Sequence, residues 1–286
     1  MNVTVGLVGV GKMGTALLSR LAAAGHRVRA FDVSEAALAA ARDAGAETVA
    51  SPADAGRGAR FVHVFTATDQ QTEDATTGAN GVFAGVSPGT MVILHSTILP
   101  ETTRRIAAAA PVGVTVIDAP ITSMPRVLAA GDGMFLVGGA TDAVEIARAH
   151  LAPLGKSIYH FGPLGSGNAA KIARNLGNVV ERVMAAETAR LVEAAGLDIE
   201  LFLDMTKNAS RSSVWANWER VLVVENGHAE PKRASGLVSK DIHHAVTLAK
   251  QFNVDMPVTR ATADTAARWA AKWKAEPPPV PQKQNA

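Results

Sequence analysis

The sequence predicts an α/β protein with a doubly wound parallel sheet in its first half and a helical second half. Two observations lead to this class. Short apolar runs alternate with helical stretches up to about Gly162, as they do in parallel sheets covered by helices. From Gly165 onward apolar residues recur at helical spacing instead, and no segment reads as a convincing strand.

The first half contains six expected strands, and they are Val3–Val8, Val28–Phe31, Phe61–Phe65, Met91–Leu94, Val114–Ile117 and Phe135–Val137. The helices expected between them are Thr15–Ala24, an Ala-rich helix that Ser34 caps and Gly45 ends, Thr102–Ala110 and Asp142–Leu151. Strands separated by helices of this length are expected to pair in parallel.

The second half contains five expected helices, and they are Asn168–Ala195, Leu197–Met205, Val214–Val224, Ser239–Phe252 and Val258–Lys274. We therefore expect three parts: an α/β domain over residues 1–164, an all-α domain over 165–275, and a Pro-rich tail over 276–286 that is disordered. The four tryptophans recur at spacings of three and four, and we expect them to pack inside the helical domain or its oligomer interface.

Composition excludes several classes of function. Lys and Arg number 28 against 26 Asp and Glu, and they are scattered, so no nucleic-acid surface is expected. There is no cysteine, which excludes disulfides, thiolate metal sites and a cysteine nucleophile. We expect no metal site, because the adjacent His243 and His244 make a poor ligand pair. No signal peptide and no run of about 20 apolar residues are visible, so a cytoplasmic protein without a membrane span is expected.

The segment from Gly9 to Gly14 has the pattern G-x-G-x-x-G between a strand and a helix. In a dinucleotide site Gly9 makes the turn, Gly11 admits the pyrophosphate, and Gly14 lets helix and strand pack closely. The intervening residues of this loop, which also belong to the expected cofactor site, are Val10, Lys12 and Met13. The pattern predicts a Rossmann-type domain with the pyrophosphate at the helix N-terminus.

Asp32 follows the second strand, 18 residues after Gly14. Its carboxylate can accept hydrogen bonds from the adenosine ribose and would repel a 2′-phosphate, which predicts NAD as the cofactor. The alternative is that Asp32 is a turn or cap residue before Ser34.

Five segments in this order resemble the β-hydroxyacid dehydrogenases of the 3-hydroxyisobutyrate dehydrogenase family, over nearly the whole chain. They are the Gly9–Gly14 loop, the run His95–Thr102 (HSTILPET), the run Asp118–Thr122 (DAPIT), the run Gly165–Asn175 (GSGNAAKIARN) and the pair Lys240–Asp241. The resemblance implies a homodimer or homotetramer and oxidation or formation of a small 3-hydroxy acid.

The resemblance implies that Lys171 transfers the proton and that Asn175, one helical turn later, assists it. Spacing alone favours a solvated helix face for this pair, and the matched motif favours catalysis. Lys240 is implied to contact cofactor or substrate, with a surface lysine as the alternative. Gly165 and Gly167 fit a close approach of backbone to a ligand.

Other residues of the matched segments are implied to line the site. The implied substrate contacts are Ser96, Thr122, Ser123 and Met124, and the implied further cofactor contacts are Thr68, Asp69 and Thr97. Ser123 and Met124 replace two glycines of the family pattern, so the substrate differs from 3-hydroxyisobutyrate or sits in a narrower pocket. His95 is interpreted as a hydrogen-bonded histidine at a strand end.

Two alternative functions follow from the same sequence. Reductases of imines or of non-standard aldehydes and ketones share the architecture, but Lys171 argues against an imine reductase. A non-catalytic NAD-binding protein would be expected to have lost Lys171 or Asn175, and both are present.

Overall fold

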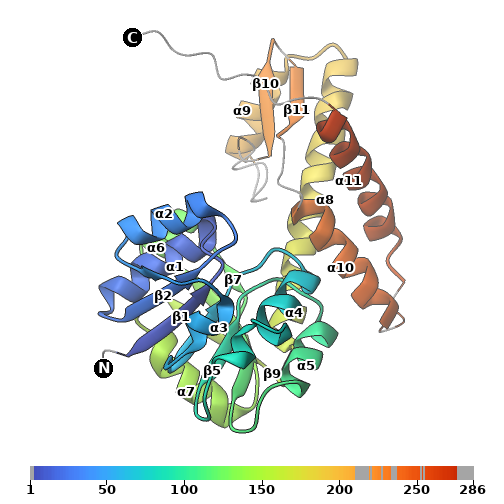
Figure 1. Cartoon of the computed structure of the whole chain (residues 1–286). Helices are drawn as coiled ribbons and strands as arrows, with labels where there is room; N and C mark the ends of the chain where they lie inside the picture. The colour runs from blue at the N-terminus through green and yellow to red at the C-terminus, as the bar shows by residue number, and fades with distance from the viewer. Residues whose placement is uncertain are drawn as a thin grey trace, which may run out of the picture. The chain divides into compact units, whose positions relative to one another are not determined.

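The computed structural model describes residues 3–209, 219, 221–226, 228–232, 237–251, 253 and 255–275. The chain divides into two compact units, Met1–Lys171 and Ile172–Ala286 (Figure 1). The Pro-rich segment 276–286, which was expected to be disordered, lies outside the described residues.

Unit 1 is built on one sheet with the strand order β3-β2-β1-β4-β5-β6-β8-β7, and β9 pairs with β8. The strands are β1 (Thr4–Val8), β2 (Arg27–Phe31), β3 (Glu47–Thr48), β4 (Phe61–Val64), β5 (Met91–Leu94), β6 (Thr115–Asp118), β7 (Ile121–Thr122), β8 (Met134–Gly138) and β9 (Ser157–Gly162). The expected Rossmann-type doubly wound sheet is confirmed, since the chain steps outward from β1 in both directions.

Helices connect these strands, with a 3₁₀ turn at Val82–Ala84. They are α1 (Lys12–Ala23), α2 (Glu35–Asp43), α3 (Pro52–Gly56), α4 (Asp69–Thr77), α5 (Pro100–Ala108), α6 (Pro125–Ala129) and α7 (Thr141–Leu151). Ser34 caps α2 as expected, because its hydroxyl accepts a hydrogen bond from the Ala37 backbone N–H.

The expectation that all strands pair in parallel is wrong at one side of the sheet. β8 runs antiparallel to both β6 and β7. Only the segment from Ser123 to Gly133 joins β7 to β8, and a parallel neighbour needs a crossover of about a dozen residues or more. β7 and β9, which the apolar pattern did not predict, complete this side of the sheet.

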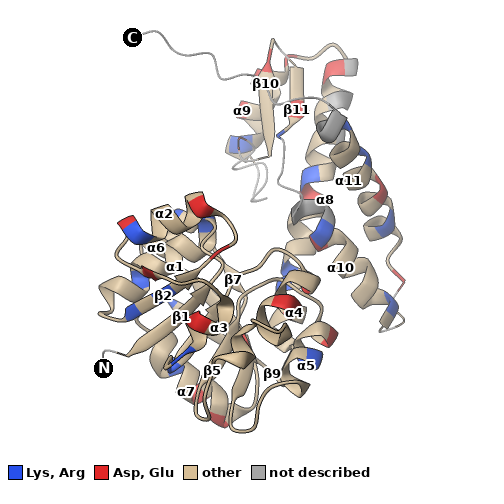
Figure 2. Ribbon diagram, in the orientation of Figure 1, with Lys and Arg blue, Asp and Glu red and all other residues tan. Residues whose placement is uncertain are grey.

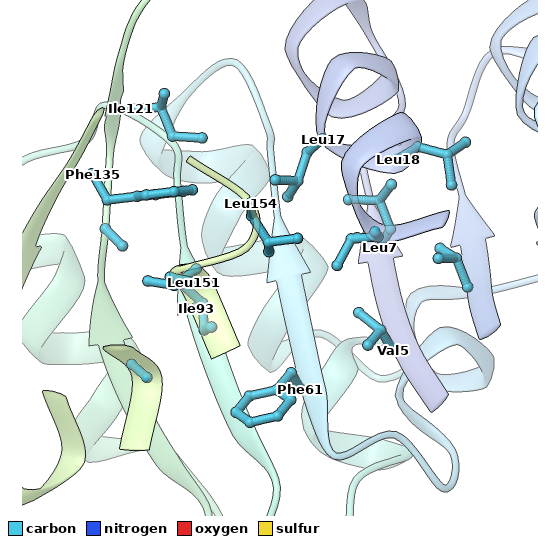
Figure 3. Packing of buried hydrophobic residues seen from close by; sticks show 14 of the residues in the cluster. Val5, Leu7, Leu17, Leu18, Phe61, Ile93, Ile121, Phe135, Leu151 and Leu154 are labelled. Carbon is cyan, nitrogen blue, oxygen red and sulfur yellow. The ribbon is translucent and has the colours of Figure 1, made fainter. Parts of the chain in front are cut away.

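The core of unit 1 lies on both faces of the sheet. Leu7 of β1 packs with Leu17 of α1 and Ile93 of β5 in one cluster (Figure 3), whereas the neighbouring Val8 belongs to a second cluster with Leu94. Successive side chains of a strand point to opposite faces, so each face is sealed by its own helices. Charged residues lie on helices such as α2 and α5, whereas β1 and β5 carry none (Figure 2).

Unit 2 is helical with one hairpin. The helix α8 (Ser166–Ala194) continues into it from unit 1, and the other elements are α9 (Ile199–Ala209), β10 (Leu222–Glu225), β11 (His228–Pro231), α10 (Leu237–Gln251) and α11 (Pro257–Ala275). The all-α expectation is therefore corrected by the antiparallel pair β10–β11, while the helical character of this part is confirmed.

The helix expected over Val214–Val224 is wrong where the structure describes it, because Leu222–Val224 belong to β10. Residues 211–218 lie outside the described residues, and so do Trp215 and Trp218. Trp269 of α11 packs against a cluster formed by α8, α9 and the hairpin, as expected. No helix among the described residues is long and apolar enough to cross a membrane.

Candidate active site

The glycine loop between β1 and α1 has the geometry of a phosphate cradle. Gly9 has φ +90°, and a Cβ there would lie 2.0 Å from the Phe65 carbonyl oxygen. A Cβ on Gly14 would lie 2.1 Å from the Gly9 carbonyl oxygen, whereas a Cβ on Gly11 would meet nothing within 4 Å. At Gly9 and Gly14 any side chain would clash with a backbone oxygen, so the fold itself requires glycine there. Gly11 instead faces open space at the start of α1.

No side chain caps the N-terminus of α1, and its first turn has no acidic residue. Exposed Lys12 begins the helix. The side chains of Val10 and Met13 pack into the core, and the Val10 N–H is used by Asp32, so the open backbone of this loop lies at Gly11 and the first turn of α1. An uncapped helix N-terminus with open space before it fits the pyrophosphate of a dinucleotide.

Asp32 is held by two backbone N–H groups. Val10 donates to its Oδ2 at 2.7 Å, and Ser34 donates to its Oδ1 at 2.9 Å. The Asp32 carboxylate therefore stabilises the turn before Ser34, which was the alternative interpretation of this residue. It also sits directly beside the glycine loop, where the ribose of a dinucleotide is expected.

Four residues implied to line the cofactor or substrate have structural contacts. Thr68 caps α4 by accepting from the Gln71 N–H, and Asp69 accepts from the Leu99 N–H at 2.9 Å. Ser96 is buried, and its Oγ accepts from the Thr66 N–H at 2.8 Å. Thr97 is half-buried in the same loop. These contacts fix the loop after β5; ligand contacts by these side chains stay a prediction.

Asp118, at the end of β6, has a role that the motif alone did not reveal. Its carboxylate accepts from the Gly165 N–H at 2.7 Å and from the Asn168 N–H at 2.6 Å, and so anchors the start of α8. Burial raises its pKa to about 6, although these backbone donors act in the opposite direction.

Glycines at the start of α8 and at the end of β8 allow this close contact between Asp118 and α8. A Cβ on Gly167 would lie 2.2 Å from the Leu136 carbonyl oxygen, and a Cβ on Gly138 would lie 2.4 Å from Asp118 Oδ1. The close approach that was expected to a ligand is thus an approach of α8 to β8 within the protein. Gly165 has φ +94°, which explains why glycine stands there.

Lys171 extends from the first turns of α8 to the segment Asp118–Thr122. Its Nζ donates to the Ile121 carbonyl oxygen at 2.6 Å. The next two hydroxyls along this segment, Thr122 Oγ1 and Ser123 Oγ, are buried and have no hydrogen-bond partner among the described residues. Met124 follows with 41% of its surface exposed. Buried hydroxyls without partners are costly, and a ligand that accepts hydrogen bonds would satisfy them.

Asn175 and Lys240 lie in unit 2. The Asn175 amide donates to Asp241 Oδ2 at 2.9 Å, and Lys240 Nζ lies 3.7 Å from Asp241 Oδ1. Lys240 and Asp241 both lie inside α10. The three side chains form one polar group that joins α8 to α10.

A chain of buried histidines crosses unit 1. His95 Nδ1 is 2.6 Å from the Ala119 carbonyl oxygen, His63 Nδ1 is 2.8 Å from His95 Nε2, and His150 Nε2 is 2.9 Å from His63 Nε2. Because a carbonyl only accepts, His95 carries its hydrogen on Nδ1. In the neutral rings His95 Nε2 then accepts from the His63 Nδ1–H, and His63 Nε2 accepts from the His150 Nε2–H. His95 is a hydrogen-bonded strand-end histidine, as interpreted from the sequence.

Burial keeps these three imidazoles neutral. It lowers the pKa of His95 to about 4 and that of His150 to about 3, and it places the pKa of His63 well below the ordinary value. The described residues contain no group of three or more His, Asp or Glu that could hold a metal ion.

Two family models match the chain along almost its full length. Residues 4–162 match the NAD binding domain of 6-phosphogluconate dehydrogenase, and residues 165–276 match the NAD-binding domain of NADP-dependent 3-hydroxyisobutyrate dehydrogenase. The chain belongs to the 3-hydroxyisobutyrate dehydrogenase family of β-hydroxyacid dehydrogenases. The resemblance drawn from the five sequence segments is confirmed.

Curated members of this family are similar over most of their length. The NAD-dependent L-serine dehydrogenase of Pseudomonas aeruginosa is 31% identical over 91% of this chain and 87% of its own. The 3-hydroxyisobutyrate dehydrogenase of the same organism is 31% identical over 89% of this chain and 88% of its own. As a family member, this chain is an oxidoreductase that uses NAD(P) and acts on the CH–OH group of small hydroxy acids.

Solved structures agree with this assignment. The 3-hydroxyisobutyrate dehydrogenase of Mycobacterium tuberculosis, solved with L-serine, is 28% identical and superimposes with a TM-score of 0.81 over 95% of this chain and 94% of its own. An imine reductase from Myxococcus stipitatus is 17% identical with a TM-score of 0.62, over 96% of this chain and 95% of its own. That similarity shows the shared fold alone.

Proposed function

We propose that this dehydrogenase of the 3-hydroxyisobutyrate dehydrogenase family prefers NAD and interconverts a compact 3-hydroxy acid and its semialdehyde or ketone, with Lys171 moving the proton. One observation carries the proposal. Lys171 Nζ is held 2.6 Å from the Ile121 carbonyl oxygen, immediately before two buried hydroxyls that lack partners. A proton-transfer group beside donors for a carboxylate is what a hydroxy acid requires.

The glycine loop supports the cofactor part of the proposal. The backbone at Gly11 and the first turn of α1 would hold the pyrophosphate, and Asp32 would accept from the ribose hydroxyls and repel a 2′-phosphate. The bound nicotinamide supplies the site that accepts or returns the hydride. Contacts of Thr68, Asp69, Thr97 and Lys240 with the cofactor stay predictions.

The segment at residues 121–124 supports the choice of substrate. Thr122 Oγ1 and Ser123 Oγ would donate to the substrate carboxylate. These hydrogen bonds would offset the free-energy cost of burying two hydroxyls that have no partner among the described residues. The Met124 side chain, which replaces a glycine of the family pattern, favours small substrates such as serine, glycerate or 3-hydroxypropionate.

In the oxidising direction the neutral Lys171 amine accepts the proton of the substrate hydroxyl at Nζ. In the reducing direction its ammonium returns that proton to the forming hydroxyl. The hydrogen bond to Ile121 keeps Nζ next to the residues that would hold the carboxylate. Asn175, paired with Asp241, is proposed to steady α8 after Lys171.

The test is turnover on a panel of hydroxy acids with NAD or NADP, followed by absorbance of the reduced nicotinamide. Lys171→Ala should lower kcat by about 10²- to 10⁴-fold, and the matched control Lys156→Ala should leave it unchanged. Ser123→Ala should raise KM for the acid more than it lowers kcat. Equal activity of the two lysine variants, or a preference for NADP, would contradict the proposal.

A homodimer or homotetramer and a cytoplasmic location also belong to this proposal. Light scattering after size-exclusion chromatography measures the oligomeric state, and fractionation of the source cells measures the location.

A further inference from the structure

A pocket of about 680 Å³ lies at the amino-terminal ends of strands β1 and β4. Its wall includes Val3, just before β1, and Phe61, the first residue of β4 (Figure 3). The glycine loop follows the other end of β1. Because β1 and β4 run parallel, their first residues lie at the same end of the sheet, and the cofactor loop lies at the opposite, carboxyl end of the strands. The pocket is therefore separate from the cofactor loop.

Three side chains of this pocket are cationic or can become so: His26, Arg60 and His150. No Asp or Glu is among the described residues that line it. His26 Nδ1 is buried and has no hydrogen-bond partner among the described residues. Because Arg60 is positively charged and no acidic residue is among the described lining residues, the pocket favours a negatively charged group, to which a protonated His26 would donate from Nδ1.

Burial lowers the pKa of both His26 and His150, so the two imidazoles are neutral at physiological pH. Among the described residues, the charged or titratable groups near them are Arg60 at the pocket wall, Arg20, His63 and His95. Arg20 donates to the carbonyl oxygen of the lining residue Pro153, and His63 is hydrogen bonded to His150. Arg60 carries the permanent positive charge. An anion beside these rings would favour their protonated forms.

The rest of the wall is apolar. Phe61 stacks on His150 with ring centroids 3.8 Å apart and planes 4° from parallel, and Ile146 leaves half of its surface exposed. Such a wall suits an apolar body attached to the anionic group. Two helices also end nearby, α1 at Ala23 and α7 at Leu151, and their C-terminal partial negative charges weaken the attraction for an anion.

We propose that this pocket is a second ligand site, which binds a small organic carboxylate with an apolar body through Arg60, His26 and His150. The opposing helix ends limit the affinity, and the dissociation constant should be in the range of about 1–10 mM.

The probe is benzoate, with benzamide as its uncharged counterpart. Each is titrated into the full-length protein saturated with NADH, and the Cε1–H signals of the histidines are followed by NMR. His26→Gln and His150→Gln assign the two signals. Benzoate should shift both signals toward their protonated positions, and benzamide should bind about tenfold more weakly or not at all.

Arg60→Gln should weaken benzoate binding by about fivefold and leave turnover of the hydroxy acid unchanged. Arg57→Gln, an exposed arginine nearby in sequence that pairs with Asp54 and does not line the pocket, is the matched control. Unshifted His26 and His150 signals at 50-fold excess over the expected constant, equal binding of benzamide, or equal loss in both arginine variants would each overturn the proposal.

Discussion

Acidification should destabilise unit 1 steeply, because its three buried histidines must remain neutral. The unfolded chain binds protons on these rings near pH 6.5, whereas the folded pKa values lie far below that. Their contribution to stability is therefore present above pH 6.5 and is lost as the pH falls toward the folded pKa values. Between pH 7 and pH 5.5 the three rings together lower the free energy of unfolding by about 4 kcal/mol, on the order of 1 kcal/mol each.

Asp118 acts in the opposite direction. Its folded pKa of about 6 is higher than its unfolded value, so its linked contribution is full at low pH and is lost as the pH rises through 6. On acidification from pH 7 to pH 5.5 it raises the free energy of unfolding by about 1 kcal/mol. The net loss expected from the four groups is about 3 kcal/mol, a large part of the stability of an ordinary domain.

Amide hydrogen exchange of peptides covering β4 and β5 measures this loss, because their exchange reports global opening of unit 1. Tryptophan fluorescence would report the wrong unit, since all four tryptophans follow residue 171. His63→Gln should reduce the loss by about 1 kcal/mol. The exposed His160→Gln should leave it unchanged. An identical pH dependence in the wild type and His63→Gln would refute the reasoning.

Three further predictions concern single contacts. Gly11→Ala should leave the melting temperature nearly unchanged and weaken NADH binding at least about tenfold, because its Cβ meets only the space reserved for the phosphates. Gly14→Ala should instead unfold the loop in a thermal melt, since its Cβ would lie 2.1 Å from a backbone oxygen; equal melts of the two variants would contradict this contrast. Asp118→Asn should destabilise unit 1 by about 1–3 kcal/mol, visible as faster amide exchange at the start of α8, and unchanged exchange there would disprove the anchor. Asn175→Leu should cost unit 2 about 2 kcal/mol in urea unfolding followed by tryptophan fluorescence, because the half-buried Asp241 loses its donor; a smaller loss than for exposed Asn208→Leu would count against it.

Local patterns predicted the parts of the fold that depend on neighbours in sequence. The apolar runs of β1 and β5 and the cap at Ser34 could be predicted because each is decided within a few residues. Strand β9 could not, since Ser157–Gly162 is mostly exposed and lacks an apolar run. The hairpin β10–β11 had a signal that was overlooked. Asn226 and Gly227 separate its strands, and Asn226 has φ 53°, which such a turn requires.

The same division applies to the site. The glycine loop and Lys171 lie in compact motifs, so the sequence identified them. In the histidine chain His63 and His95 are 32 positions apart in the sequence, and His63 and His150 are 87 positions apart. A local sequence pattern cannot predict hydrogen bonds between residues so far apart. Ser96 is implied to touch substrate, and in the structure its Oγ accepts a hydrogen bond from the Thr66 N–H, a partner 30 positions away that the motif does not indicate. Only the packing of distant strands decides which hydroxyls are left for a ligand.

The double hydrogen bond of Asp32 has a consequence for redesigning coenzyme preference. The same carboxylate that disfavours a 2′-phosphate also ties the Val10 amide to the turn at Ser34. Replacing Asp32 by serine to admit NADP would therefore also loosen the glycine loop for either coenzyme. A productive switch would keep the acid and recruit a cation at Val33, whose side chain is 94% exposed next to it. In this chain the residue that is proposed to select the coenzyme also fixes the loop, so replacing Asp32 itself would change both properties together.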